Sequence, residues 1–164
     1  MTTLHFIYGK PAAGKTTLAR RLATEYRAAL FIEDEWLVLL EAEINSLADY
    51  VRHARRLRAA LAPHVIRLLQ LGVPVVFDFA ANTPKDRAWV RSIFEAANAD
   101  HMLHVIEASD AFCKERLRQR NEAKPDGVYY GEVSEATYDA VTRHIVPPSD
   151  DEGFGVTRYD AEAM

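Results

Sequence analysis

Apolar residues are grouped in two ways along this chain, in short continuous runs and in longer helically spaced stretches. The continuous runs have the length of β-strands: Leu4–Tyr8, Ala29–Ile32, Val73–Phe79, His101–Ile106 and Gly155–Tyr159. The run at Val73–Phe79 is the clearest, because it is rich in β-branched residues and apolar until Asp78. An apolar run without polar alternation is typical of a strand buried on both faces, so the pattern indicates a parallel sheet.

Helical spacing of apolar residues occupies the segments between the predicted strands. The predicted helices are Lys15–Ala28, Trp36–Leu71 with a break near Asn45-Ser46, Thr83–Asn98, Asp110–Asn121 and Ser134–Ile145. Gly72 follows the longest of them, at the position where glycine often ends a helix. Glu122–Glu132 contains a proline and two glycines and is predicted to be a loop. This alternation of strands and helices predicts a single α/β domain over residues 1–164 with a mainly parallel sheet.

Composition narrows the class of protein. The chain has 164 residues, of which 49% are hydrophobic, enough to bury a core without disulfides or metals. Its net charge of −4 gives no general attraction to nucleic acid or to an anionic membrane. The single cysteine, Cys113, cannot form an internal disulfide, and the six histidines are not spaced as zinc ligands. No apolar run approaches the ~20 residues of a membrane helix and no signal peptide is recognisable, so we expect a cytoplasmic protein.

The segment Gly9–Thr16 matches the phosphate-binding loop Gly-x-x-x-x-Gly-Lys-[Ser/Thr], known as Walker A. It lies between a predicted strand and a predicted helix, which is the context that the motif requires. In such a loop, backbone amides point at phosphate oxygens, the lysine neutralises the β- and γ-phosphates and the threonine hydroxyl binds Mg²⁺. We therefore expect ATP and Mg²⁺ to bind, although the loop does not read the base and GTP fits the same motif. The expected nucleotide ligands are Gly9, Ala12, Ala13, Gly14, Lys15, Thr16 and Thr17.

Two acidic positions follow predicted strands at the edge of the sheet where the phosphate loop lies. Asp34, in Glu33-Asp34-Glu35, is a candidate general base that accepts the proton of an acceptor hydroxyl. The alternative is that these acids only cap the next helix. Asp78 occupies a position like that of Walker B, where it would bind Mg²⁺, orient the acceptor or cap local backbone. Asn82 follows within reach of the same edge and is a further candidate substrate residue.

Two groups of arginines are candidates for contacts with substrate. Arg116 and Arg120 are four residues apart and share one helix face, so they are expected to close over the triphosphate during phosphoryl transfer. The alternative is that they are solvated surface residues. The segment 116–132 is predicted to be a lid, because its polar loop has few apolar residues to hold it in place. A second basic cluster, either the wet face of a helix or a site near the acceptor, contains Arg52, Arg55, Arg56 and Arg58.

In five blocks, the sequence resembles the small P-loop kinases of the group that holds polynucleotide 5′-hydroxyl kinases, zeta-type toxins and chloramphenicol phosphotransferases. It is more similar still to the compact bacterial ATP-binding proteins of that group. The blocks are Gly9–Thr17, Phe31–Trp36, Val75–Pro84, Arg116–Asn121 and Pro147–Phe154. The resemblance implies a kinase-type three-layer sandwich with a five-stranded parallel sheet of order 2-3-1-4-5 and a mobile lid. It also implies that Asp34 is the general base, Asp78 a substrate- or metal-side aspartate, and Arg116 and Arg120 lid arginines.

One departure from these relatives bears on the acceptor. The polynucleotide kinases carry an arginine three residues after the base aspartate, where it helps to hold the acceptor's phosphate, and this chain has Leu37 there. The departure and the acidic net charge both favour a small molecule over nucleic acid. We therefore expect an ATP-dependent kinase that transfers the γ-phosphoryl group to a hydroxyl of a small-molecule acceptor. The alternatives are a polynucleotide or nucleoside 5′-hydroxyl kinase and an NTP-binding switch or ATPase module.

Overall fold

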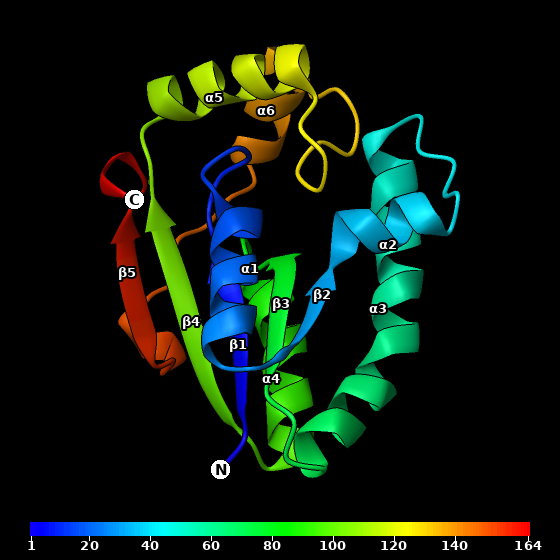
Figure 1. Ribbon diagram of the computed structural model, residues 1–164, viewed down its shortest axis with the longest axis vertical. Helices are drawn as coiled ribbons and strands as arrows, with labels where there is room; N and C mark the ends of the chain where they lie inside the picture. Colours follow the sequence, from blue (N-terminus) through cyan, green and yellow to red (C-terminus); the bar gives the residue numbers. More distant parts are fainter.

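The computed structural model describes all 164 residues of the chain and contains one five-stranded sheet (Figure 1). Its strands are β1 (Thr3–Tyr8), β2 (Ala29–Ile32), β3 (Val75–Ala80), β4 (Asp100–Glu107) and β5 (Val156–Asp160). All neighbouring strands are parallel, and their order is β2-β3-β1-β4-β5. The α/β class, the parallel sheet and the strand order expected from the sequence are therefore confirmed.

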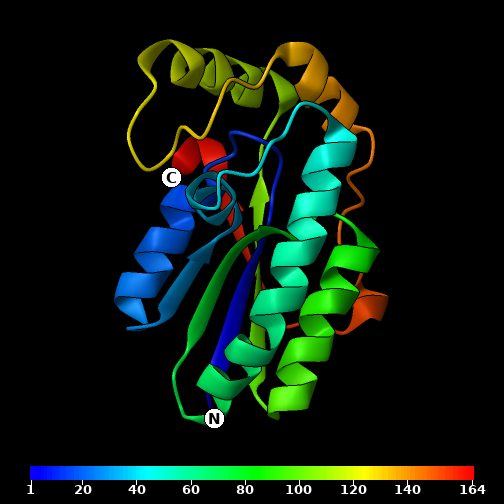
Figure 2. The ribbon, with the colours of Figure 1, turned by 90° about the vertical axis from the view of Figure 1, so that its right-hand side faces the viewer.

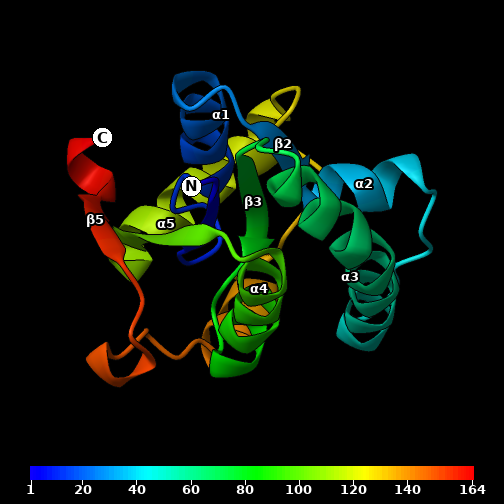
Figure 3. The same cartoon turned by 90° about the horizontal axis from the view of Figure 1, so that it is seen from below.

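Helices cover both faces of the sheet. They are α1 (Lys15–Glu25), α2 (Glu33–Leu39), α3 (Leu47–Gln70), α4 (Pro84–Ala97), α5 (Asp110–Ala123) and α6 (Glu135–Thr142), with 3₁₀ turns at Asp150–Glu152 and Ala161–Ala163. α3 and α4 lie on one face of the sheet and α1 on the other, as Figures 2 and 3 show. α5 and α6 lie beyond the carboxyl ends of the strands (Figure 1). None of the helices is both long and apolar enough to cross a membrane.

Each face of the sheet has its own apolar core. On the face of α3 and α4, buried residues such as Leu61, Val65 and Phe77 pack together. On the face of α1, Leu18 and Leu22 belong to a second buried cluster. Because both faces are covered, side chains on either side of a strand are buried, which explains the continuous apolar runs in the sequence.

The predicted helices and strands are all present, but some of their ends differ. α1 ends at Glu25 rather than Ala28, because Arg27 adopts a left-handed conformation with φ of 51°. β3 begins at Val75 rather than Val73, since the intervening Pro74 has no amide hydrogen for the strand ladder. The predicted break in the long helical stretch is confirmed as the gap between α2 and α3.

A buried arginine connects the C-terminal segment to the edge of the sheet. Arg87 of α4 is fully buried, and its guanidinium donates to Glu152 Oε2 and Oε1 at 2.7 and 2.8 Å. The same guanidinium donates to the carbonyl oxygens of Ala81, at 2.9 Å, and Val146, at 3.0 Å. A buried charge needs this degree of pairing to be tolerated. The network was not predictable from local patterns, because Arg87 and Glu152 are 65 residues apart in the chain.

Candidate functional site

A cavity of about 1730 Å³ opens at the carboxyl edge of the sheet, between the strand ends, the start of α3, and the helices α5 and α6. In an open α/β sheet, this edge is the usual place for a ligand. Most of the predicted site residues line the cavity: Ala12, Gly14, Lys15, Thr16, Thr17, Asp34, Asp78, Asn82, Arg116 and Arg120. Gly9 and Ala13 are buried within the phosphate loop and do not line the cavity. The fold therefore brings the predicted residues together around one space.

The phosphate loop runs from β1 into α1, which begins at Lys15. Gly14 precedes the helix with φ of 106°, a conformation that glycine adopts without steric cost. No side chain caps the first turn of α1. The first amides of a helix have no partners within the helix, and together with the helix dipole they attract an anion. The start of α1 therefore has the geometry of a phosphate site.

Lys15 lies across its own loop. Its ammonium donates to the carbonyl oxygen of Gly9 at 2.8 Å and to that of Lys10 at 2.9 Å. Burial lowers the pKa of Lys15, and the negative charges of Asp78 and Asp34 oppose this effect. A charged oxygen is a stronger partner for an ammonium than a neutral carbonyl is. An anionic ligand in the cavity would therefore compete well for Lys15.

Thr16 and Asp78 form the floor of the cavity. The Thr16 hydroxyl donates to Asp78 Oδ2 at 2.5 Å. Burial raises the pKa of Asp78, while the Thr16 hydrogen bond and the Lys15 charge lower it. Hydroxyl and carboxylate oxygens are ligands that Mg²⁺ accepts, usually one or two from the protein with phosphates and water completing the shell. No group of three or more histidine, cysteine or acidic side chains is placed to hold a metal ion, so the pair fits Mg²⁺ only in company with phosphate oxygens.

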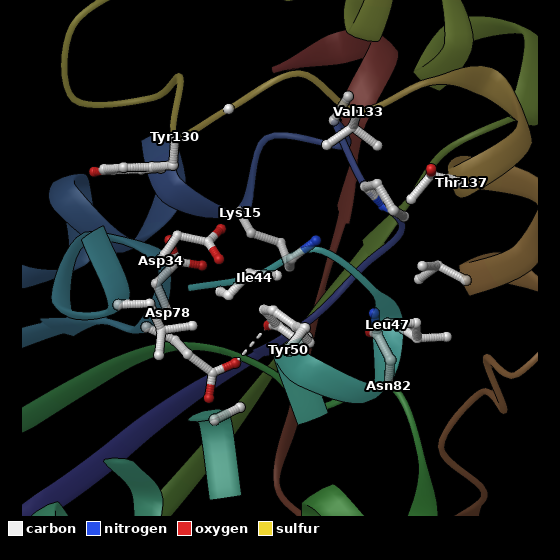
Figure 4. Close-up of a pocket in the computed structure, with 18 of the residues that line it drawn as sticks. Lys15, Asp34, Ile44, Leu47, Tyr50, Asp78, Asn82, Tyr130, Val133 and Thr137 are labelled. Carbon is white, nitrogen blue, oxygen red and sulfur yellow. Dashed lines mark hydrogen bonds between the residues drawn. The ribbon is translucent and has the colours of Figure 1, made fainter. Parts of the chain in front are cut away.

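Asp34 lies in the first turn of α2, directly after β2, and its side chain is exposed to the cavity (Figure 4). No hydrogen bond to protein contributes to its ionisation. Although water reaches the side chain, the surrounding protein removes much of its hydration, and this desolvation is the main reason why the pKa of Asp34 is raised to about 6; the charges of Asp78 and Glu33 add to the effect. The positive charges of Lys15 and Arg120 oppose it. The site therefore contains a carboxylate that is free to receive a proton.

The side chain of Asn82, which the sequence suggested as a substrate contact, is hydrogen-bonded to the protein backbone instead. Its Oδ1 accepts the amide of Gly9 at 3.0 Å, and its Nδ2 donates to the carbonyl oxygen of Gly9 at 2.9 Å. Both ends of the side-chain amide are thus occupied by the first residue of the phosphate loop. The geometry makes Asn82 a positioning residue for the loop, and its contact with substrate stays a prediction.

Arg116 and Arg120 lie on α5 and face the phosphate loop. Arg116 Nη1 is 3.5 Å from the position that a Cβ on Gly14 would occupy. Arg120 Nε is buried without a hydrogen-bond partner, and burial lowers the pKa of Arg120. Arg118, between them, is exposed and pairs with Glu115 at 2.8 Å. The pair is therefore in place to meet a ligand, whereas Arg118 is a solvated surface residue.

An ion-pair network that the sequence analysis missed supports one wall of the cavity. Arg58 of α3 donates from Nε to Glu33 Oε2 and from Nη1 to Asp86 Oδ1, each at 2.7 Å. The Tyr50 hydroxyl donates to Glu33 Oε1 at 2.7 Å. The sequence does indicate that Arg58 could be partly buried, because it follows Leu57 and so lies at the margin of the apolar face of its helix. The other arginines of that cluster, Arg52, Arg55 and Arg56, are exposed.

The loop between α5 and α6 belongs to the predicted lid. Asn121 closes its base, because its side chain donates to the carbonyl oxygen of Val133 at 2.8 Å and accepts the Val133 amide at 3.3 Å. Arg20 of α1 donates to the carbonyl oxygen of Gly127 at 3.0 Å. Such polar contacts break and re-form more easily than apolar packing does. That segment 116–132 closes over a nucleotide stays a prediction.

The sheet order, the phosphate loop and the cavity beside it define a P-loop kinase-like protein. A family model described as an AAA domain matches residues 4–148, and the chain belongs to this family. None of the curated proteins matches the sequence.

Solved structures share the fold over nearly the whole chain. A presumed kinase from Chloroflexus aurantiacus J-10-fl is 24% identical with a TM-score of 0.72, covering 97% of this chain and 85% of that one. Kti12 from Chaetomium thermophilum, in complex with ADP-AlF3, is 18% identical with a TM-score of 0.69, covering 95% and 89%. The APS kinase CysC from Mycobacterium tuberculosis, in complex with AMPPNP and APS, is 21% identical with a TM-score of 0.61, covering 97% and 88%. Likeness at these identities establishes the fold.

Proposed function

We propose that this protein is an ATP-dependent phosphotransferase that moves the γ-phosphoryl group of ATP to a hydroxyl of a small-molecule acceptor. The observation that carries the proposal is the position of Asp34, a carboxylate that faces the same cavity as the phosphate-loop lysine. A binding module for nucleotide alone has no need of such a group. Two proteins of the same fold, Kti12 and the APS kinase, were solved with nucleotide analogues, which supports ATP as the donor.

The phosphate loop and two arginines would bind the triphosphate. The first amides of α1 and the Lys15 ammonium receive the β- and γ-phosphates. On binding, Lys15 exchanges the carbonyl oxygens of Gly9 and Lys10 for phosphate oxygens. Arg116 and Arg120 approach the phosphates from α5, on the other side of the cavity.

Thr16 and Asp78 are the residues that would hold Mg²⁺, for the reasons of oxygen chemistry given above. When bound, Mg²⁺ neutralises charge on the β- and γ-phosphates. Asp78 lies in β3 and Thr16 in the first turn of α1, and the hydrogen bond between their side chains supports a shared metal site.

Asp34 would accept the proton during transfer. Its carboxylate accepts a hydrogen bond from the acceptor hydroxyl and orients the hydroxyl oxygen toward the γ-phosphorus. As the new oxygen–phosphorus bond forms, the bond from the γ-phosphorus to the β,γ-bridging oxygen breaks, ADP leaves and the proton passes to Asp34. With a pKa of about 6, Asp34 is mostly ionised at neutral pH and still basic enough to take the proton.

The experiment that tests the proposal measures ATP consumption with and without hydroxyl compounds, selected first by their effect on thermal stability with AMP-PNP present. We expect ADP formation that depends on the acceptor, and a phosphate monoester that phosphorus NMR identifies. Hydrolysis that no acceptor increases would support an ATPase or an NTP-binding switch instead. Transfer to the 5′-hydroxyl of an oligonucleotide in preference to small molecules would support a polynucleotide kinase.

A further inference from the structure

The cavity extends beyond the phosphate loop, and its far part is mainly apolar, with Ser46 and Thr137 among its polar lining residues. One wall contains Leu47 and Val51, in the first turns of α3, and Ile44, in the loop before it. Another wall includes Ala140 of α6 and Val133, which precedes that helix. Figure 4 shows Ile44, Leu47 and Val133 around this space, with Lys15 and Asp34 beside it. In contrast to the charged end at the phosphate loop, this end offers mainly hydrocarbon surface to a ligand.

The apolar wall at the start of α3 and in the loop before it is exposed. Ile44 is 40% exposed, Leu47 is 50% exposed and Val51 is 56% exposed. Single exposed apolar residues are common, but a contiguous exposed group in a cavity is typical of a binding surface. Covering these side chains with an apolar group would stabilise the complex through the hydrophobic effect.

Free positive charge is scarce in this part of the cavity. Arg58 is held by two carboxylates, at 2.7 Å each. Leu37, at the position where polynucleotide kinases carry a phosphate-binding arginine, is only 4% exposed and belongs to the core. Arg55 and Lys85 also line the cavity, but both are solvent-exposed. An acceptor with a phosphate or carboxylate would therefore find no buried cation here to compensate for its desolvation.

We infer that the acceptor is an uncharged alcohol with an apolar body, whose hydroxyl faces Asp34 while the body lies between the start of α3 and α6. This inference rests on the proposed function, since it assigns the reacting hydroxyl to Asp34. The products are ADP and the phosphate monoester of that alcohol, with the hydroxyl proton on Asp34.

A tryptophan of the chain can report on binding in the cavity. It has two tryptophans, of which Trp89 lines the cavity and Trp36 does not. Trp36→Phe makes Trp89 the only tryptophan and keeps an aromatic ring against Phe31. In this background, tryptophan fluorescence is titrated with 3-phenylpropan-1-ol, with glycerol and with thymidine 3′-phosphate, each with and without AMP-PNP and Mg²⁺. These probes are an apolar alcohol, an uncharged alcohol without an apolar body and an anionic 5′-hydroxyl compound.

We expect a saturable change in tryptophan fluorescence with 3-phenylpropan-1-ol and no such change with glycerol or thymidine 3′-phosphate. Leu47→Gln should weaken the binding of 3-phenylpropan-1-ol about tenfold, because a polar group replaces an apolar contact. Leu71→Gln is the matched control, since Leu71 lies at the other end of α3, is 61% exposed and does not line the cavity. The Leu71 variant should bind 3-phenylpropan-1-ol as tightly as the Trp36→Phe protein does. Binding of thymidine 3′-phosphate in preference to the apolar alcohol, or equal effects of the two leucine variants, would overturn the inference.

The titrations also separate the inference from the proposed function. Calorimetry measures the affinity for AMP-PNP on the same samples. If AMP-PNP binds and 3-phenylpropan-1-ol does not, the apolar acceptor is wrong while the nucleotide site stands. If 3-phenylpropan-1-ol binds and AMP-PNP does not, the apolar site stands and the kinase proposal is wrong.

Discussion

The two ends of the cavity are built in different ways. The phosphate end is lined mainly by residues of one contiguous segment, Pro11–Thr17, with Asp34 and Asp78 at or next to the ends of neighbouring strands. The proposed acceptor end consists of side chains from α3, α6 and the loops that precede them, which are far apart in the sequence. The phosphate end is therefore shaped by local conformation, and the acceptor end by the placement of helices. We therefore expect that the proposed acceptor end can change without disturbing the phosphate end. Such independence is typical of folds that carry different functional sites on a shared scaffold.

The largest expected effect comes from breaking the phosphate end. Lys15→Ala should nearly abolish binding of ATP and its turnover, because the ammonium neutralises the β- and γ-phosphates. The fold should survive, since the Lys15 ammonium contacts only carbonyl oxygens of its own loop. Calorimetry with AMP-PNP checks the affinity, and circular dichroism checks the fold. Lys114→Ala is the control, because Lys114 pairs with Asp139 outside the cavity. Wild-type affinity and turnover in the Lys15 variant would disprove the phosphate site.

Asp34→Asn should affect turnover and ATP affinity to different extents. Asparagine keeps the shape of the side chain but cannot take the proton, so turnover should fall by about 10²–10⁴-fold. Affinity for ATP should change much less. Steady-state kinetics and calorimetry measure the two quantities, with Glu35→Gln as the neighbouring control outside the cavity. Equal losses of affinity and turnover would assign Asp34 to the phosphate end, as an organiser of Mg²⁺.

Arg120→Ala should lower turnover by about 10²-fold with a modest loss of ATP affinity, because a preorganised charge contributes most in the transition state. The structure offers a matched control on the same helix. Arg118 is exposed and pairs with Glu115 and Glu122, so Arg118→Ala should leave both quantities near the wild-type value. If the two variants behave alike, Arg120 is a surface residue and not part of the site.

Hydrogen exchange can show whether the phosphate end includes the lid. With AMP-PNP and Mg²⁺ bound, amides in 116–132 should exchange about tenfold more slowly, because closure over the nucleotide removes their local opening. The amides of Gly9–Thr17 should slow as well. Slower exchange confined to the phosphate loop would mean that 116–132 is a fixed surface segment.

A polar cluster under α1, outside the cavity, should give the smallest effect. His5 Nδ1 and His104 Nε2 lie 3.0 Å apart, and His104 Nδ1 lies 2.9 Å from the Tyr159 hydroxyl. Burial lowers the pKa of His5 and that of His104, the latter to about 4. An unfolded histidine has a pKa near 6.5. On acidification below that value, the unfolded chain binds protons before the folded protein does.

The contribution of these histidines to the free energy of unfolding should therefore be fully present above about pH 6.5. It should be lost progressively as the pH falls toward 4. At pH 5.5 the loss attributable to His104 is on the order of 1 kcal/mol. Urea unfolding at pH 7.5 and 5.5 measures it. His104→Gln should lose part of this pH dependence, whereas the exposed His144→Gln should keep it. A wild-type protein whose stability is the same at both pH values would show that these histidines titrate normally.

Features that depend on short-range patterns were predictable from the sequence. The turn and helix start at Gly9–Thr16 follow from glycines and a lysine at fixed spacing, and the strands follow from continuous apolar runs. The break before α3 was also predictable, because Ser46 has the side chain that caps a helix, and it accepts the Asp49 amide in the structure. Asp34 and Asp78 could be assigned to the cavity because parallel strands end at one edge of the sheet.

The tertiary fold, in contrast, settles which distant side chains meet. It placed Arg58 between two carboxylates, directed Asn82 to the backbone of Gly9, and buried Arg87 against Glu152. It also left Leu47 exposed in the cavity rather than in the core. Helical periodicity identifies the apolar face of a helix, but the partner of that face depends on how elements far apart in the chain pack together. The acceptor end of the cavity is made of such contacts, which is why it could not be read from local patterns.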